Sequence, residues 1–209
     1  MTFIQKTRHA TVLPCLAAMT TLSTPTISFA KAEQTVFSGP HVGAAIGAVD
    51  QQLIILERFG TATQRELHVN RWGLGGELFA GYDIMIAKRL LIGGEAQLGV
   101  GGGSPVFNGA TGTIGIKPRY GFSVTGRLGY VASPKILLYA GGGYGGQEYR
   151  GILTDNVSAR TDRFILGARS FVLRAGAERS LSKHTSIRLE FEHFAGRRNQ
   201  FLIGVPIRF

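Results

Sequence analysis

Apolar and polar side chains alternate with a period of two along several segments of this chain. The final segment shows it most clearly, because Phe201, Ile203, Val205, Ile207 and Phe209 share one parity. The positions between them hold Leu202, Gly204, Pro206 and Arg208. In 187–192, Ile, Leu and Phe alternate with Arg and two Glu residues. This pattern predicts β-strands with one uniformly apolar face.

Eight segments carry the pattern, and each is close to the ~9 to 11 residues that a tilted membrane strand needs. They are 42–48, 74–84, 90–100, 120–130, 136–148, 171–178, 187–192 and 201–209. In 136–148 the parity is ambiguous, because Gly141, Gly142 and Gly143 interrupt it. No stretch after residue 30 reaches 18 uninterrupted apolar residues, so spanning helices are not expected. An even number of strands suits a closed barrel whose two ends lie on one side.

The connections between these segments alternate in length. The expected loops at 50–71, 101–118 and 149–163 are long, whereas 85–89, 132–135 and 180–184 are short. The last connection, 195–199, is an exception, because the alternation predicts a long loop there and the connection is short. Short periplasmic turns and long outer loops give this rhythm in outer-membrane barrels. A soluble β-sandwich shares the alternating faces, but gives no reason for the connections to alternate and would be released without detergent.

The first 30 residues predict a secretory signal peptide. A positive stretch with Lys6 and Arg8 precedes a short apolar run, and Ser28-Phe29-Ala30 ends in a small residue. We expect cleavage after Ala30, leaving 31–209 as one barrel domain. The apolar run is too short to span a bilayer as a helix. Cys15, the single cysteine, lies in the segment to be removed, which excludes an intrachain disulfide.

Composition adds two constraints. The chain has 30 glycines and only 17% charged residues, which suits neither a helical bundle nor a soluble parallel sheet. Its formal net charge is +10, and residues 31–209 keep 21 basic and 13 acidic side chains. No run of five basic residues occurs, so lipid phosphate is a better partner than nucleic acid. The glycine runs near residues 73 and 101 lack the lysine-serine ending of a phosphate-binding loop.

Charged residues gather on the polar parity of the predicted strands. If the apolar parity faces lipid, five acids and four bases face the interior: Glu77, Glu95, Arg127, Arg174, Glu178, Arg188, Glu190, Glu192 and Arg208. They should pair, because an unpaired buried charge costs several kcal/mol. Small inward glycines leave room for them in a narrow eight-stranded barrel. We therefore expect a plugged lumen and no cofactor.

Two sets of residues are expected on the outer surface. Aromatic residues near the strand ends predict interfacial girdles, namely Trp72, Tyr82, Phe122, Tyr130, Tyr139, Phe201 and Phe209. Basic residues of the outer region are candidates for binding lipopolysaccharide phosphates, with a simple solvated surface as the alternative. They are Arg58, Arg65, Arg71, Lys117, Arg119, Arg150, Arg160, Arg163, Arg197 and Arg198.

Several short motifs, in order, resemble the porin-family outer-membrane β-barrel proteins, which include opacity-like and alphaproteobacterial major surface proteins. The motifs are Gly81-Tyr82-Asp83, Leu91-Ile92-Gly93-Gly94-Glu95, Gly126-Arg127-Leu128-Gly129-Tyr130, Leu138-Tyr139-Ala140-Gly141-Gly142 and Leu189-Glu190-Phe191-Glu192. The resemblance covers nearly all of 35–209. It implies an eight-stranded surface antigen, with adhesive or haem-binding roles in some members. It also implies that the barrel-assembly machinery reads Phe209 as a carboxy-terminal signal.

Three other functions stay open at this point. His193-Phe194-Ala195 resembles a motif of lipid A deacylases, but Ala195 stands where the serine nucleophile is needed, so no enzyme is expected. His184-Thr185-Ser186 has the spacing but falls in an expected periplasmic turn. His68, in an outer loop, is a candidate haem ligand among otherwise scattered histidines. A small diffusion pore is the main alternative to a plugged surface protein that displays loops to host molecules.

Overall fold

A computed structural model describes residues 35–59, 63–109, 112–155, 157–158, 160–195 and 198–209. The expected signal peptide 1–30 and its cleavage position Ala30 lie outside these residues. Within them, no helix is long and apolar enough to cross a membrane.

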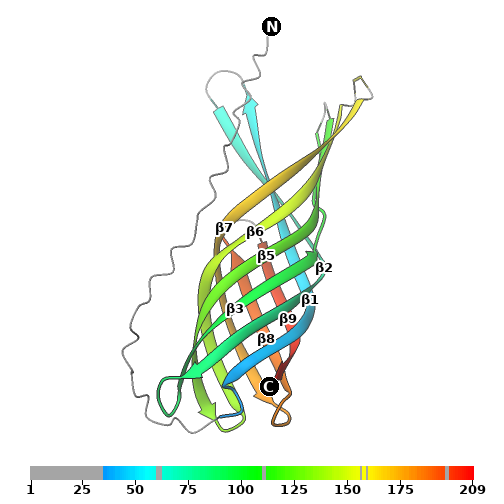
Figure 1. The fold of residues 1–209 in the computed structure, drawn as a ribbon. Coiled ribbons are helices and arrows are strands. Elements are labelled where there is room, and N and C mark those ends of the chain that lie inside the picture. The colour runs from blue at the N-terminus through cyan, green and yellow to red at the C-terminus, as the bar shows by residue number, and fades with distance from the viewer. Residues whose placement is uncertain (1–34, 60–62, 110–111, 156, 159, 196–197) are drawn as a thin grey trace, which may run out of the picture. The chain divides into compact units, whose positions relative to one another are not determined.

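The described residues form nine antiparallel strands: β1 Gly39–Phe59, β2 Thr63–Met85, β3 Leu90–Gly101, β4 Val106–Asn108, β5 Gly112–Ser133, β6 Ile136–Asp155, β7 Arg160–Ser180, β8 Ser186–Phe194 and β9 Arg198–Arg208. Eight of them make the wall of a barrel (Figure 1), which closes where β1 pairs with β9 and β3 pairs with β5. The short β4 pairs with the outer part of β5. The eight-stranded all-β fold expected from the sequence is confirmed.

The short connections lie where the sequence predicts them. The turns between strands fall at 86–89, 134–135 and 181–185, together at one end of the barrel, which we call the turn end. Phe209 also lies at this end, where its backbone N–H donates to the carbonyl oxygen of Pro40 at 3.1 Å.

The prediction that 50–71 and 149–163 are long loops is wrong. Residues of 50–59 pair with residues of 63–72, from Asp50 opposite Trp72 to Phe59 opposite Thr63. β6 and β7 pair in the same way up to Asp155 opposite Arg160. Of the expected loop 101–118, residues 106–108 form β4 and 112–118 begin β5. The strands continue past the barrel because each added pair satisfies backbone donors and acceptors.

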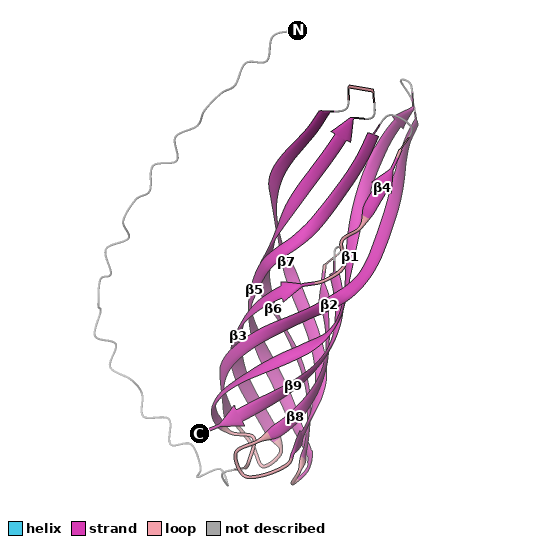
Figure 2. Ribbon diagram, turned by 90° about the vertical axis from the view of Figure 1, so that its right-hand side faces the viewer, coloured by secondary structure: helices cyan, strands magenta, loops and turns pink. Residues whose placement is uncertain are grey.

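These extensions form two outer arms. The first arm consists of residues 53–59 of β1 and 63–69 of β2. The second arm consists of β4 with residues 112–117 of β5, 150–155 of β6 and 160–169 of β7. Figures 1 and 2 show the arms rising from the same end of the barrel, opposite the turn end. β8 and β9 are much shorter, so the barrel wall is low between β7 and β1. β9 pairs with β1 only as far as Gln51, and β8 pairs with β7 only as far as Val172. Within the described residues, the outer parts of β1 and β7 each therefore keep a free edge.

Side chains in the barrel wall alternate between an exposed apolar face and a buried polar face. On β2, Leu78 is 64% exposed and its neighbour Glu77 is 9% exposed. On β5, Val124 is 61% exposed and Thr125 is 2% exposed. An exterior of this kind requires an apolar surrounding, because a large continuous apolar surface is unfavourable in water.

Glycines allow the close approach of strands in this narrow barrel. A Cβ atom at Gly143 would lie 2.0 Å from the carbonyl oxygen of Val124 on the neighbouring strand β5. Where β3 ends, Gly101 and Gly102 have φ values of 90° and 116°, which side chains other than glycine rarely adopt. This turn leads the chain from β3 towards β4.

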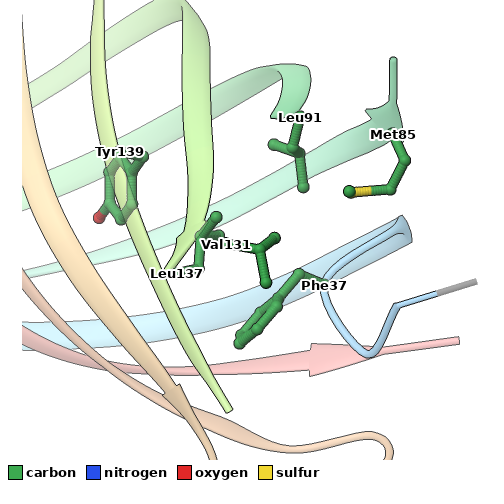
Figure 3. Packing of buried hydrophobic residues seen from close by; sticks show 6 residues of the cluster. All are labelled: Phe37, Met85, Leu91, Val131, Leu137 and Tyr139. Atoms are coloured by element: carbon green, nitrogen blue, oxygen red, sulfur yellow. The ribbon is translucent and has the colours of Figure 1, made fainter. Parts of the chain in front are cut away.

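Two apolar clusters lie in the described part of the barrel. The inner cluster, at the turn end, consists of Phe37, Met85, Leu91, Val131, Leu137 and Tyr139. Figure 3 shows the ring of Phe37 beside Val131 and Leu137. The outer cluster, at the base of the arms, consists of Leu53, Ile116, Tyr149, Ala168, Val172 and Phe194. Charged side chains fill the space between these clusters.

Candidate functional site

The structure brings together all nine interior charges that the sequence predicts. Their side chains are buried on the polar face of six strands: Glu77 on β2, Glu95 on β3, Arg127 on β5, Arg174 and Glu178 on β7, Arg188, Glu190 and Glu192 on β8, and Arg208 at the end of β9. We call this set, with the polar residues bonded to it, the lumen network.

Glu95 is the centre of the lumen network. Its Oε1 atom lies 2.9 Å from Nη1 of Arg174, and its Oε2 atom lies 2.9 Å from Nη2 of Arg188. Nε2 of His41 is also 2.9 Å from Oε2, and Nη1 of Arg127 is 3.5 Å away. The Glu95 carboxylate therefore contacts three guanidinium groups and one imidazole, which come from four other strands.

A second group of ion pairs lies nearer the turn end. Nε of Arg127 donates to Oδ1 of Asp83 at 2.8 Å. Arg208 donates to Glu178, with Nη2 at 3.2 Å from Oε2, and lies 3.4 Å from Asp83. These pairs join β2, β5, β7 and β9, so they connect the barrel across its interior.

A third group lies nearer the arms. Nη2 of Arg174 donates to Oε2 of Glu192 at 2.7 Å, and Arg198 donates to the other oxygen of Glu192 at 2.5 Å. Arg198 also donates to Oε1 of Gln147 at 2.7 Å. Arg198 was expected to be an outer ligand for phosphate, and this assignment is wrong because its side chain turns into the mouth of the barrel.

Aromatic rings support the guanidinium groups. The guanidinium carbon of Arg188 lies 4.3 Å from the ring centre of Phe79 and 5.5 Å from that of Tyr139. The hydroxyl of Tyr139 donates to Oε2 of Glu190 at 2.5 Å. Tyr139 is therefore an interior residue, and its expected place in an outer girdle is wrong. The other girdle candidates, Trp72, Tyr82, Phe122, Tyr130, Phe201 and Phe209, are exposed.

Glu77 differs from the other acids of the network. Among the described residues it has no ion-pair partner, and it accepts one hydrogen bond, from Nε2 of Gln200 at 3.3 Å. It lines a hollow of about 20 Å³ together with Gln97, Gln147 and Arg198. This volume holds about one water molecule.

Sequence reasoning missed two members of the network with ionisable side chains, His41 and Asp83. Nδ1 of His41 lies 3.3 Å from Oδ2 of Asp83, and both side chains are fully buried. Both residues stand on the polar parity of their strands, so the parity alone would have placed them inside. Gln97 is a third member, because its side chain bonds to Glu95, Glu190, Ser123 and Arg174.

Five of the outer basic residues, Lys117, Arg119, Arg150, Arg160 and Arg163, lie on the second arm or close to its base. Lys117 on β5 and Arg150 on β6 are direct cross-strand neighbours, and both are exposed. Arg119 pairs with Glu148, and Arg160 with Asp162 at 3.1 Å. Arg71 and Arg163 are also exposed. Arg197 and the side chains of Arg58 and Arg65 lie outside the described residues.

A carboxylate fixes the end of the second arm. Oδ1 of Asp155 accepts a hydrogen bond from the backbone N–H of Val157 at 2.8 Å, and Oδ2 accepts one from the hydroxyl of Ser158 at 2.8 Å. These hydrogen bonds to the ionised form hold the pKa of Asp155 below its usual value.

The remaining candidate histidines have polar partners. Nδ1 of His68 lies 2.8 Å from Nε2 of Gln52, and Nδ1 of His193 lies 2.7 Å from Oδ1 of Asn199. Nδ1 of His184 lies 3.1 Å from the carbonyl oxygen of Arg208, at the turn end. Within the described ranges, no group of three His, Cys, Asp or Glu side chains is placed to hold a metal ion.

Comparison with known proteins identifies the class of this barrel. Residues 15–209 match the family model of the outer membrane protein beta-barrel domain, and the chain belongs to that family. It is thus a protein of the bacterial outer membrane. The turn end accordingly faces the periplasm and the arms face outward, since periplasmic turns are short in such barrels. No curated protein matches the chain by sequence.

Several solved structures with a similar fold are outer-membrane proteins, at low sequence identity. OprG from Pseudomonas aeruginosa has a TM-score of 0.52 and 11% identity, covering 82% of this chain and 97% of its own. Ail, the attachment invasion locus protein of Yersinia pestis, has a TM-score of 0.46 and 13% identity, covering 83% and 100%. Neisserial surface protein A has a TM-score of 0.48 and 11% identity, covering 82% and 98%.

Proposed function

We propose that the protein is a closed surface barrel that displays two stiff β-arms for interaction outside the cell, and that it does not catalyse a reaction. The observation that carries this proposal is the lumen network, which fills the interior with paired charges while the strands extend outward as arms. The finer family assignment, to surface antigens of the alphaproteobacterial type, is part of the same proposal.

The closed lumen separates this proposal from a diffusion channel. Apolar clusters lie at both ends of the network, and the hollow beside Glu77 has room for about one water molecule. We expect no reproducible single-channel steps when the protein is inserted into planar bilayers. A variant that breaks the network, Glu95→Ala, serves as the comparison for leak currents. Regular conductance steps from the unaltered protein would contradict the proposal and favour the small porin.

The geometry near the last strands supports a non-enzymatic role. His193 bonds to Asn199, and the residue two positions on is Ala195, which has no hydroxyl to attack an ester. His184-Thr185-Ser186 lies at the turn end, away from the leaflet that holds lipopolysaccharide. His68 bonds to Gln52, and a haem-binding role for it remains the weaker candidate.

Lipopolysaccharide phosphate is the partner we propose for the second arm. Lys117 and Arg150 stand directly opposite each other across β5 and β6, a like-charge pair that is unfavourable unless an anion lies between its members. Tyr120 and Phe122, further along β5, are exposed on the barrel exterior, which places the pair next to the membrane surface. A phosphate group would accept hydrogen bonds from both side chains.

Neutralising this pair tests that partner. In Lys117→Gln/Arg150→Gln we expect affinity for lipopolysaccharide micelles to fall roughly thirtyfold at low salt, since each basic residue near an anionic surface contributes about 1 kcal/mol. The matched control is Arg160→Gln/Arg163→Gln, which removes two exposed charges from the outer part of β7 on the same arm, further from the membrane surface. Equal losses in both double variants would show that only net charge matters.

The free edges of the arms support a role in binding surface molecules of a host. Among the described residues, nothing pairs with one side of the outer part of β7, and Ile165 and Leu166 are exposed on its two faces. An exposed edge of this kind can accept an additional strand from another protein. The barrel-assembly machinery is a further proposed partner, supported by the exposed ring of Phe209 at the turn end.

A further inference from the structure

The periplasmic turns carry an unusual concentration of positive charge. Each of the three turns holds one lysine, Lys88, Lys135 or Lys183. Arg89 lies in the first of these turns, Arg179 comes just before the third, and His184 follows Lys183. All six side chains are exposed, and we call them the periplasmic rim.

Within the described part of the chain, no exposed acidic side chain lies next to the periplasmic rim. The three turns contain no Asp or Glu. On the strands next to them, the carboxylates of Asp83 and Glu178 are buried and already bonded to Arg127 and Arg208. On the second arm, by contrast, Arg119 and Arg160 each have an acidic partner. The exposed charges of the rim are therefore all positive.

The rim is held at the level of the membrane surface. Backbone hydrogen bonds close the turns, with Ile86 N–H donating to the Leu90 carbonyl at 2.9 Å and Leu181 N–H to the Thr185 carbonyl at 2.9 Å. Ile86 and Leu181, both in turns, are exposed apolar residues. Such turns cannot carry their lysines far into the periplasm, and their apolar side chains favour contact with lipid.

Two arginines of the rim are placed as interfacial residues. Nη1 of Arg89 donates to the hydroxyl of Tyr130 at 3.3 Å, and Tyr130 is exposed on the barrel exterior. Arg179 lies between Ile136 and Ile187 on the neighbouring strands. Its apolar stem can follow this surface while its guanidinium reaches the headgroups.

A hollow of about 370 Å³ adjoins the rim. It combines apolar walls with two basic side chains, and its lining residues are Thr35, Val36, Lys88, Arg89, Val131, Ser133 and Pro134. This mixture suits a group that is anionic at one end and apolar at the other.

We infer that the periplasmic rim binds the headgroups of anionic glycerophospholipids in the periplasmic leaflet of the outer membrane. The phosphate groups accept hydrogen bonds from Lys and Arg side chains around the barrel, while acyl chains cover the exterior beside Tyr130 and Ile136. Peptidoglycan is the other polyanion near this end. The short turns and the exposed apolar residues in them favour lipid, because a polymer below the membrane would not meet Ile86 and Leu181.

The test is photo-crosslinking in vesicles. The protein extracted from outer membranes is reconstituted with photoactivatable phosphatidylglycerol or photoactivatable phosphatidylcholine, and crosslinked peptides are identified by mass spectrometry. We expect phosphatidylglycerol to exceed phosphatidylcholine roughly fivefold in peptides covering 86–90, 134–136 and 181–185, the factor that one basic residue near an anionic surface confers. In Lys88→Gln/Arg89→Gln/Lys135→Gln/Lys183→Gln the ratio should fall to about one.

A control and two further measurements decide the outcome. Lys117→Gln/Arg150→Gln/Arg163→Gln/Arg169→Gln removes four charges from the outer side and should leave the ratio at the turns unchanged. For the unaltered protein, raising the salt to about 1 M should also bring the ratio to about one, because charges are then screened beyond ~3 Å. A ratio of about one at low salt, or an unchanged ratio in the rim variant, would overturn the inference. Charge-dependent sedimentation with purified peptidoglycan, without lipid preference, would assign the rim to peptidoglycan instead.

Discussion

Replacing Glu95 by alanine is expected to destabilise the barrel by about 3 to 5 kcal/mol, because several buried guanidinium groups lose the carboxylate that they share and keep only part of their compensating negative charge. Arg174, Arg188 and His41 all contact this carboxylate at 2.9 Å. The change should appear as a lower midpoint in urea unfolding of the reconstituted protein.

Glu77→Ala is the matched control, since it makes the same chemical change on the same face of the barrel. Glu77 has one hydrogen bond, from Gln200, and no ion pair in the described part of the chain. We expect its loss to cost no more than about 1 kcal/mol. If the two variants had equal stability, Glu95 would not be the centre of the network.

Placing an arginine on the outer face of the barrel is the second large effect. Val124 is 61% exposed on β5, in the outward row between Tyr120 and Tyr130. We expect those rings to lie at the two membrane surfaces, which would place Val124 near the centre of the apolar layer. Val124→Arg should destabilise the folded protein by about 2 to 4 kcal/mol, as measured by urea unfolding in lipid vesicles.

Leu153→Arg provides the comparison on the same sheet. Leu153 is also exposed, but it lies in the outer part of β6, beyond the barrel wall. An arginine there stays in water, so we expect a change within about 0.5 kcal/mol. A cost at Leu153 as large as that at Val124 would show that the apolar layer does not end where the aromatic rings lie.

The alternation of residue types predicts the barrel and most of its interior, because the two faces of each strand meet different surroundings. Glu95 and Arg188 could be placed inside on that ground alone. The same rule extends to Arg198, which shares the parity of Gln200 and Leu202. Because Arg198 lies at the end of a strand, the sequence alone suggests a loop residue. In the structure its side chain bonds to Glu192.

Two features could not be read from the pattern. Tyr139 precedes three glycines, which carry no side chain and so give no indication of which face is inside. The arms were expected to be loops because a strand needs an apolar face only where it contacts lipid, so the alternating pattern ends at the membrane surface. Hydrogen bonding between neighbouring strands does not end there, and β1 and β2 continue as a ribbon well beyond it. Which charges meet in the lumen depends on the register across the barrel, which a single sequence does not contain.

The ring of Phe37 lies in the inner cluster beside Val131 and Leu137 (Figure 3), and the guanidinium of Arg208 lies 5.7 Å from its centre. Residues from opposite ends of the described chain therefore meet in one small space. This contact joins residues that are far apart in the sequence, and the entropy of closing so long a loop places it late in folding. The pairing of β1 with β9 thus also closes the periplasmic end of the lumen. A barrel whose wall is complete therefore has a closed periplasmic end.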